Sequence, residues 1–227
     1  MAQTLQETPL ASHRVLVWEL PVRLFHWTIF LLVACAYLTW RLNWMDWHVW
    51  IGYAALTAVL FRILWGFFGG DCARFARFLT GPRAAAAHLR HALRREPDRQ
   101  VGHNAAGGWM VMLLLALLLA ETLSGLLIYN DIADEGPLTE LMPAQLGSAI
   151  MATHAIGWDL LAGAVSVHVA AILLYATAKR QNLVRPMITG HKTLPAEVTA
   201  PRRGGALRAI VLLAISAIAV AALSRYL

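Results

Sequence analysis

The sequence predicts an all-α integral membrane protein, and three observations support this fold class. The 227 residues are 59% hydrophobic and only 14% charged, whereas a soluble domain of this size carries more charge. Apolar runs near the length of a transmembrane helix occur five times along the chain. Basic residues gather in alternate connecting segments, as they do in multi-pass membrane proteins.

The five apolar runs define the expected helices in order. Each is close to the ~20 residues that a spanning helix needs. The fourth is longer, so we expect it to tilt or to extend beyond the bilayer. We also expect a short surface helix over 83–95, with alanine and leucine on one side and histidines and arginines on the other. The expected spans are 22–40, 47–67, 105–128, 148–178 and 207–223.

The basic residues predict the orientation of the spans. Arginines precede the first span, and most of the remaining lysines and arginines follow the second and the fourth. The positive-inside rule then places the amino terminus in the cytoplasm and the carboxy terminus outside. The net charge of +6 reflects this topology and contact with lipid headgroups, and gives no support to nucleic-acid binding.

The third loop is acidic and contains no lysine or arginine. Such a loop can steer a partner with a basic docking face, for example a small c-type cytochrome or a periplasmic oxidoreductase. The alternative is that its acids only complete the asymmetry of charge across the membrane. The acids concerned are Asp131, Asp134, Glu135 and Glu140.

Two histidines on the fourth span carry the strongest chemical signal. His154 and His168 are fourteen residues apart, which places both on one helix face with ~21 Å between them along the axis. The hydrocarbon core of a bilayer is ~30 Å thick, so the two side chains lie near its opposite sides. Polar groups at such depth are costly and usually functional.

Two further histidines match these levels. His48 starts the second span at the outer level of His154, and His26 lies in the first span at the inner level of His168. Each pair can clamp one planar iron porphyrin between facing helices. Ligation by two histidines fills both axial positions of the iron, which suits electron transfer. No Cys-x-x-Cys-His motif is present, so we expect noncovalent haem.

Several neighbours have a role beside these ligands or a structural alternative. Gly52 and Gly157 share a face with a histidine and can let a porphyrin approach, or can serve helix packing. Arg62 lies fourteen residues after His48 and can pair with haem propionates, or can reach the interface as a snorkelling residue. Arg23 has a similar role, with membrane topology as its alternative.

His103 and Glu121 remain open. His103 begins the third span and can be a ligand, a haem-edge or quinone contact, or an interfacial residue. Glu121 lies inside that span and either takes protons from a quinol or reaches the outer interface. We expect the remaining histidines to contact solvent or headgroups; these are His13, His88, His91 and His191.

The motifs around these residues resemble the prokaryotic cytochrome b-561 family, which includes the cytochrome b subunits of nickel–iron hydrogenases. The resemblance covers about Val15 to Lys192 in family order, through RLFHW, HVWIGY, FRILWGFFG, GHNAAGG and QNLVRPMITGHK. It implies a four-helix bundle that holds two b haems on His26, His48, His154 and His168. It also implies a bacterial inner-membrane protein that exchanges electrons with quinone and with a redox partner such as a hydrogenase-like oxidoreductase.

A fifth helix without histidine departs from this family pattern. We therefore expect a di-haem domain over 1–192 and a linker with a fifth transmembrane helix over 193–227. The leading functional hypothesis is electron transfer across the membrane between the quinone pool and a partner protein. A superoxide:quinone oxidoreductase is the alternative within redox chemistry, so the sequence leaves open whether the chain is itself an enzyme. A metal or proton transporter is the alternative from another class.

Overall fold

The computed structural model describes residues 12–90, 100–128, 143 and 146–225. Five of its helices are long and apolar enough to cross a membrane, which confirms the five expected spans. Their bounds agree with the expected runs to within a few residues. They are α1 (Leu20–Arg41), α2 (Met45–Phe68), α5 (Ala105–Leu126), α6 (Gly147–Thr177) and α8 (Ala206–Arg225).

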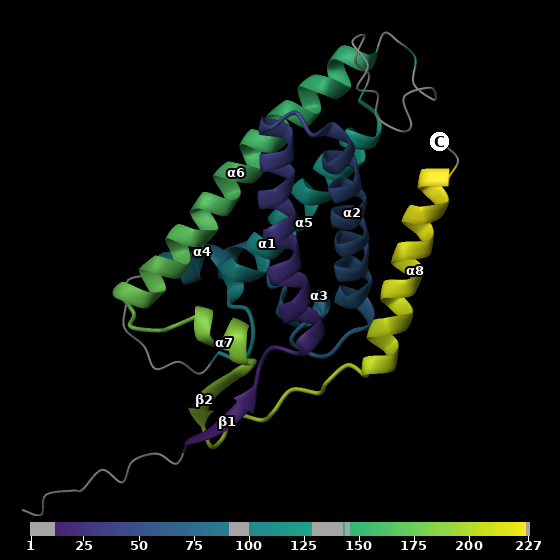
Figure 1. The fold of residues 1–227 in the computed structure, drawn as a ribbon. Helices are drawn as coiled ribbons and strands as arrows, with labels where there is room; N and C mark the ends of the chain where they lie inside the picture. The colour runs from purple at the N-terminus through teal and green to yellow at the C-terminus, as the bar shows by residue number, and fades with distance from the viewer. Residues whose placement is uncertain (1–11, 91–99, 129–142, 144–145, 226–227) are drawn as a thin grey trace, which may run out of the picture.

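The five long helices form a bundle, in which α2 contacts three of the others (Figure 1). Helix α1 turns into α2 over a short connection in which Asn43 adopts a left-handed φ of 57°, so the two helices run antiparallel side by side. Helices α5 and α8 both pack against α2, and α6 packs against α5. The four-helix core is therefore α1, α2, α5 and α6, with α8 added on the outside of α2.

The central core of the bundle draws on all four core helices. Ile29 of α1, Ala55 and Val59 of α2, Leu118 of α5 and Leu161 of α6 form one buried cluster. Burial that removes the apolar area of aliphatic side chains from water stabilises a fold by roughly 25 cal/mol per Å². Where water is not the reference, close packing holds these side chains together. This cluster fixes the four helices relative to one another midway along the bundle.

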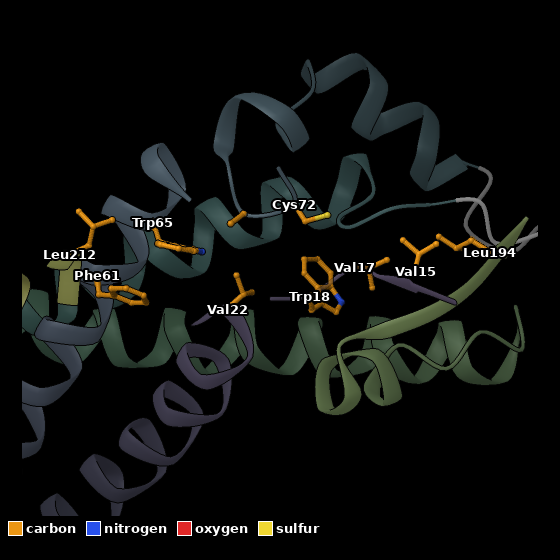
Figure 2. Packing of buried hydrophobic residues seen from close by; sticks show 10 residues of the cluster. Val15, Val17, Trp18, Val22, Phe61, Trp65, Cys72, Leu194 and Leu212 are labelled. Carbon is orange, nitrogen blue, oxygen red and sulfur yellow. The ribbon is translucent and has the colours of Figure 1, made fainter. Parts of the chain in front are cut away.

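A second cluster lies at the end of the bundle where α1 begins and α2 ends (Figure 2). We call this the arginine-rich end, because most of the arginines lie in the segments before α1 and after α2 and α6. Trp18, just before α1, and Val22, in its first turn, belong to it, together with Phe61 and Trp65 near the end of α2. Leu212 of α8 joins the same cluster, and Trp65 is fully buried. The fifth helix is thus packed into the core at this end.

A two-stranded antiparallel sheet joins segments that are far apart in the sequence. Strand β1 (Ser12–Leu16) pairs with β2 (His191–Pro195), and Ser12 lies opposite Pro195 while Leu16 lies opposite His191. The sequence did not predict this sheet, because neither five-residue strand has a neighbouring hairpin partner. Gly190 precedes β2 with a φ of 84°, and its carbonyl accepts hydrogen bonds from the amides of Val17 and Trp18.

Three short helices complete the arginine-rich end. They are α3 (Phe75–Phe78), α4 (Pro82–Arg90) and α7 (Val184–Thr189). Helix α4 agrees with the expected surface helix as far as Arg90, and 91–99 lie outside the described residues. Helices α3 and α7 were not expected from the sequence.

Candidate functional site

The structure brings the four histidines together as two pairs, at opposite ends of the bundle. The ring centres of His26 on α1 and His168 on α6 lie 6.4 Å apart. Those of His48 on α2 and His154 on α6 lie 6.5 Å apart. The partners are those expected from the levels of the residues along their helices.

The spacing of both pairs is that of two imidazoles sharing one metal. An imidazole–metal bond is about 2 Å long and the ring centre lies about 1 Å beyond the nitrogen, so two opposed ligands have ring centres about 6 Å apart. The measured 6.4 Å and 6.5 Å agree with this value. The residues present therefore fit one axially ligated metal per pair.

Hydrogen bonds at the His48 end orient both rings. Nδ1 of His48 lies 2.9 Å from the carbonyl oxygen of Ala36, so the Nδ1–H tautomer donates to it. Nδ1 of His154 lies 3.1 Å from the carbonyl oxygen of Glu121 and 3.0 Å from Oγ of Ser124. Each bond fixes a ring and leaves Nε2 as the nitrogen for a metal.

Glu121 is part of this end of the site. Its Oε1 lies 3.4 Å from Nε2 of His154, and its buried Oε2 has no hydrogen-bond partner among the described residues. A Cβ at Gly157 would collide with Oε2 of Glu121, so the glycine makes room for this carboxylate. Glu121 thus faces the bundle interior and does not extend toward the outer membrane interface.

Arg62 is buried at the other end, with only 2% of its surface exposed. It donates from Nη1 to the carbonyl of Ala73 over 3.3 Å, and its guanidinium lies 5.4 Å from the ring centre of Phe75. Nη2 is buried without a partner among the described residues. The structure therefore shows a buried cation here, and not the snorkelling arginine that was the alternative.

His103 packs close to Arg62 and to the His26 pair. Its ring lies between Trp18 and Phe78, with both ring centres 4.6 Å away. Burial, and then the nearby Arg62 and histidines, lower the pKa of His103 to about 3. Its Nδ1 is buried without a hydrogen-bond partner in the described part of the chain.

Arg23 and Gly52 occupy different settings. Arg23 donates from Nη1 to the carbonyl of Ile188 and so ties α1 to α7, while its Nε is buried and unpaired among the described residues. Gly52 lies one turn after His48 on α2, and a Cβ built there meets no atom within 4 Å. A flat cofactor beside His48 would need such open space.

One polar cluster was missed by the sequence reasoning. Tyr175 on α6 has its hydroxyl 2.6 Å from Nε2 of His88 and 2.8 Å from the side-chain nitrogen of Asn104. His88 therefore binds another helix, and the expectation of a solvent or headgroup residue was wrong. No local signal could show this, because the partners are 71 and 87 residues apart.

The comparisons with known proteins agree with the geometry. The model of the family described as prokaryotic cytochrome b561 matches residues 17–190, which include all four paired histidines. Among the curated proteins, none matches the chain. The match covers well over half of the sequence and all four core helices. The chain therefore belongs to the prokaryotic cytochrome b561 family, a family of four-helix membrane bundles whose haem transfers electrons across the bilayer.

Proposed function

We propose that this protein holds two noncovalent b haems and carries electrons across the membrane between the quinone pool and a redox partner protein. The observation that carries the proposal is the pair of histidine sites at opposite ends of α6. Their ring spacings of 6.4 Å and 6.5 Å suit one iron each. Helical rise separates His154 from His168 by about 21 Å, so the two sites divide the bilayer between them.

The ligand set indicates the kind of chemistry. Bound haem supplies a one-electron carrier at each site. The Nδ1 atoms of His48 and His154 are taken by hydrogen bonds, so their Nε2 atoms would hold the iron of this site, and a haem held by two histidines would have no free position for oxygen. The carbonyls of Ala36 and Glu121 hold the rings in place, which limits reorganisation when an electron arrives.

The neighbours at the Arg62 end suit the edge of a haem. A buried guanidinium with an unpaired Nη2 calls for an anion, since an isolated buried charge is costly. In our proposal a haem propionate supplies that anion at Arg62. The unpaired Nε of Arg23, a less deeply buried residue, would bind a propionate in the same way. Gly52 leaves space for the other porphyrin beside His48.

The orientation follows from the distribution of arginines. We propose a bacterial inner-membrane protein in which the end with β1, β2 and α4 is cytoplasmic and the carboxy terminus is periplasmic. A c-type cytochrome or a hydrogenase-like oxidoreductase would then exchange electrons at the opposite end. The acids proposed to steer such a partner lie outside the described residues; they are Asp131, Asp134, Glu135 and Glu140.

A haem count on the purified protein tests the proposal. The pyridine haemochrome assay, referred to protein concentration, is expected to give two haem b per chain, with low-spin bands in the reduced spectrum. A ratio of one haem per chain would mean that only one of the two proposed sites binds haem. Haem that survives denaturation on the polypeptide would contradict noncovalent binding, and a colourless protein would favour the transport alternative.

A further inference from the structure

A groove opens between the end of α2 and the start of α8, on the outside of the four-helix core. It has a volume of about 810 Å³ and lies beside the turn at Gly69 and Gly70. Its α8 wall comes from residues beyond position 190, outside the part of the chain that the family model matches. The groove is therefore a feature of the added fifth helix and its linker.

One part of the groove is strongly basic. Four arginines line it: Arg74, Arg202, Arg203 and Arg208. Arg74 is paired with Asp71, whose other carboxylate oxygen accepts from the amide of Arg202. Arg208 reaches across the groove and donates to the carbonyl of Phe68 over 2.9 Å. The guanidinium groups of Arg202, Arg203 and Arg208 are exposed and make no ion pair among the described residues.

Acidic neighbours do not cancel this charge. Asp71 is already shared between Arg74 and Arg77. Glu19 is buried, its Oε1 accepts a hydrogen bond from the amide of Gly204, and its carboxyl group interacts electrostatically with Arg203 without forming an ion pair. The lining therefore keeps a net positive charge that faces outward.

The remaining part of the groove is apolar and faces the lipid. Phe67 and Phe68 at the end of α2 are more than half exposed, and Ile215 on α8 is 50% exposed. Leu64 and Leu212 form the floor between the two helices. Ile215 lies two turns into α8, whereas the arginines lie at its start, so the surface changes from basic to apolar along the axis of a spanning helix.

We propose that this groove binds an anionic phospholipid, with the phosphate at Arg203 and Arg208 and the acyl chains along Phe68 and Ile215. Basic pockets between transmembrane helices are sites for such headgroups, because the cations lie at headgroup depth and the walls below are apolar. The lipid would fill the space between α2 and α8 and hold the fifth helix on the bundle. A free phosphate ion would satisfy the arginines but would leave the apolar walls uncovered.

Native mass spectrometry of the haem-loaded protein tests the site directly. The protein in detergent is titrated with phosphatidylglycerol, with cardiolipin and, separately, with phosphatidylcholine of matched chain length. The wild type is expected to retain the anionic lipids in preference to phosphatidylcholine. The double substitution Arg203→Gln and Arg208→Gln is expected to weaken anionic-lipid binding by about tenfold or more, since each basic group near the membrane contributes measurably.

The matched control is Arg83→Gln with Arg90→Gln, two exposed arginines of α4 at the same end of the bundle. An equal loss of lipid in the control pair would show unspecific surface charge and overturn the proposal. Equal retention of phosphatidylcholine would overturn it as well, and so would displacement of the lipid by millimolar inorganic phosphate. If the double variant does not fold, Arg203→Gln alone gives the same comparison, because Arg203 makes no hydrogen bond among the described residues.

Discussion

The ring of His48, in the first turn of α2, faces the ring of His154 on α6 with 6.5 Å between their centres and 83° between their planes. Their Nδ1 atoms are engaged by carbonyl oxygens of two other helices, Ala36 on α1 and Glu121 on α5. All four core helices thus contribute to one histidine pair. A substitution at this pair therefore acts on the site without removing a core hydrophobic residue.

Replacing one histidine is expected to remove one haem and to spare the other. His48→Ala and His154→Ala should lose the same component in a potentiometric titration, and His26→Ala and His168→Ala should lose the other. The reason is that each proposed haem would be held by one histidine pair, and the two pairs share no residue. His13→Ala, at an exposed position in β1, is the control and should keep both components. Loss of the same component by His48→Ala and by His26→Ala would show that the pairing is wrong.

Gly52→Leu should lower the haem content without unfolding the protein. A side chain at this position begins in open space in the structure, so the bundle tolerates it, but a porphyrin beside His48 would meet it. The expected haem-to-protein ratio falls from two toward one. Gly163→Leu on α6 is the matched control, because that glycine is exposed and also has open space. An equal haem-to-protein ratio in Gly52→Leu and Gly163→Leu would show that Gly52 does not lie beside a haem.

Arg62→Met should leave most of the haem bound and lower the potential of the His26–His168 component. A positive charge stabilises the added electron, and a charge about 5–10 Å away at an effective dielectric of about 20 contributes about 2–3 kcal/mol, on the order of 100 mV. Redox titration of both components measures the shift, and the His48–His154 component serves as the internal reference. An unchanged potential would mean that Arg62 acts only through Ala73 and Phe75.

The spanning helices and the pairing of the histidines could be predicted because both depend on local regularities. Apolar length predicts a span, and helical rise with alternating direction places His26 and His168 at one level. The fold within the membrane has few alternatives, since the backbone must satisfy its own hydrogen bonds there.

The arginine-rich end could not be predicted, because it depends on contacts between distant segments. The β1–β2 pairing joins Leu16 to His191, and the Tyr175 cluster joins three helices. The burial of Arg62 is of the same kind. Its sequence position allowed both a snorkelling and a buried side chain, and the packing of Phe75 and Ala73 decides between them.

Two carboxylates attach the linker that leads to α8, and they respond to pH in opposite directions. The amide of Arg202 and the neighbouring arginines lower the pKa of Asp71, whereas burial raises the pKa of Glu19. The Asp71 contribution is present above its unfolded pKa of about 3.9 and is lost as pH falls through the lower folded value. The Glu19 contribution is present below its unfolded pKa and is lost as pH rises through its raised folded value.

Asp71→Asn should therefore loosen the linker at neutral pH, because it removes the charge that pairs with Arg74 and accepts from Arg202. Limited proteolysis between residues 196 and 205 is expected to proceed about fivefold faster than in the wild type, in line with an exposed ion pair worth about 1 kcal/mol. The difference should shrink as pH falls through the lowered pKa of Asp71, where this carboxyl becomes protonated in the wild type. Glu19→Gln is the contrasting variant: its amide oxygen can still accept from Gly204, and removal of a buried charge should slow cleavage at pH values above the raised pKa of Glu19. Equal cleavage of the wild type and Asp71→Asn at pH 7 would show that α8 is held by its packing on α2 alone.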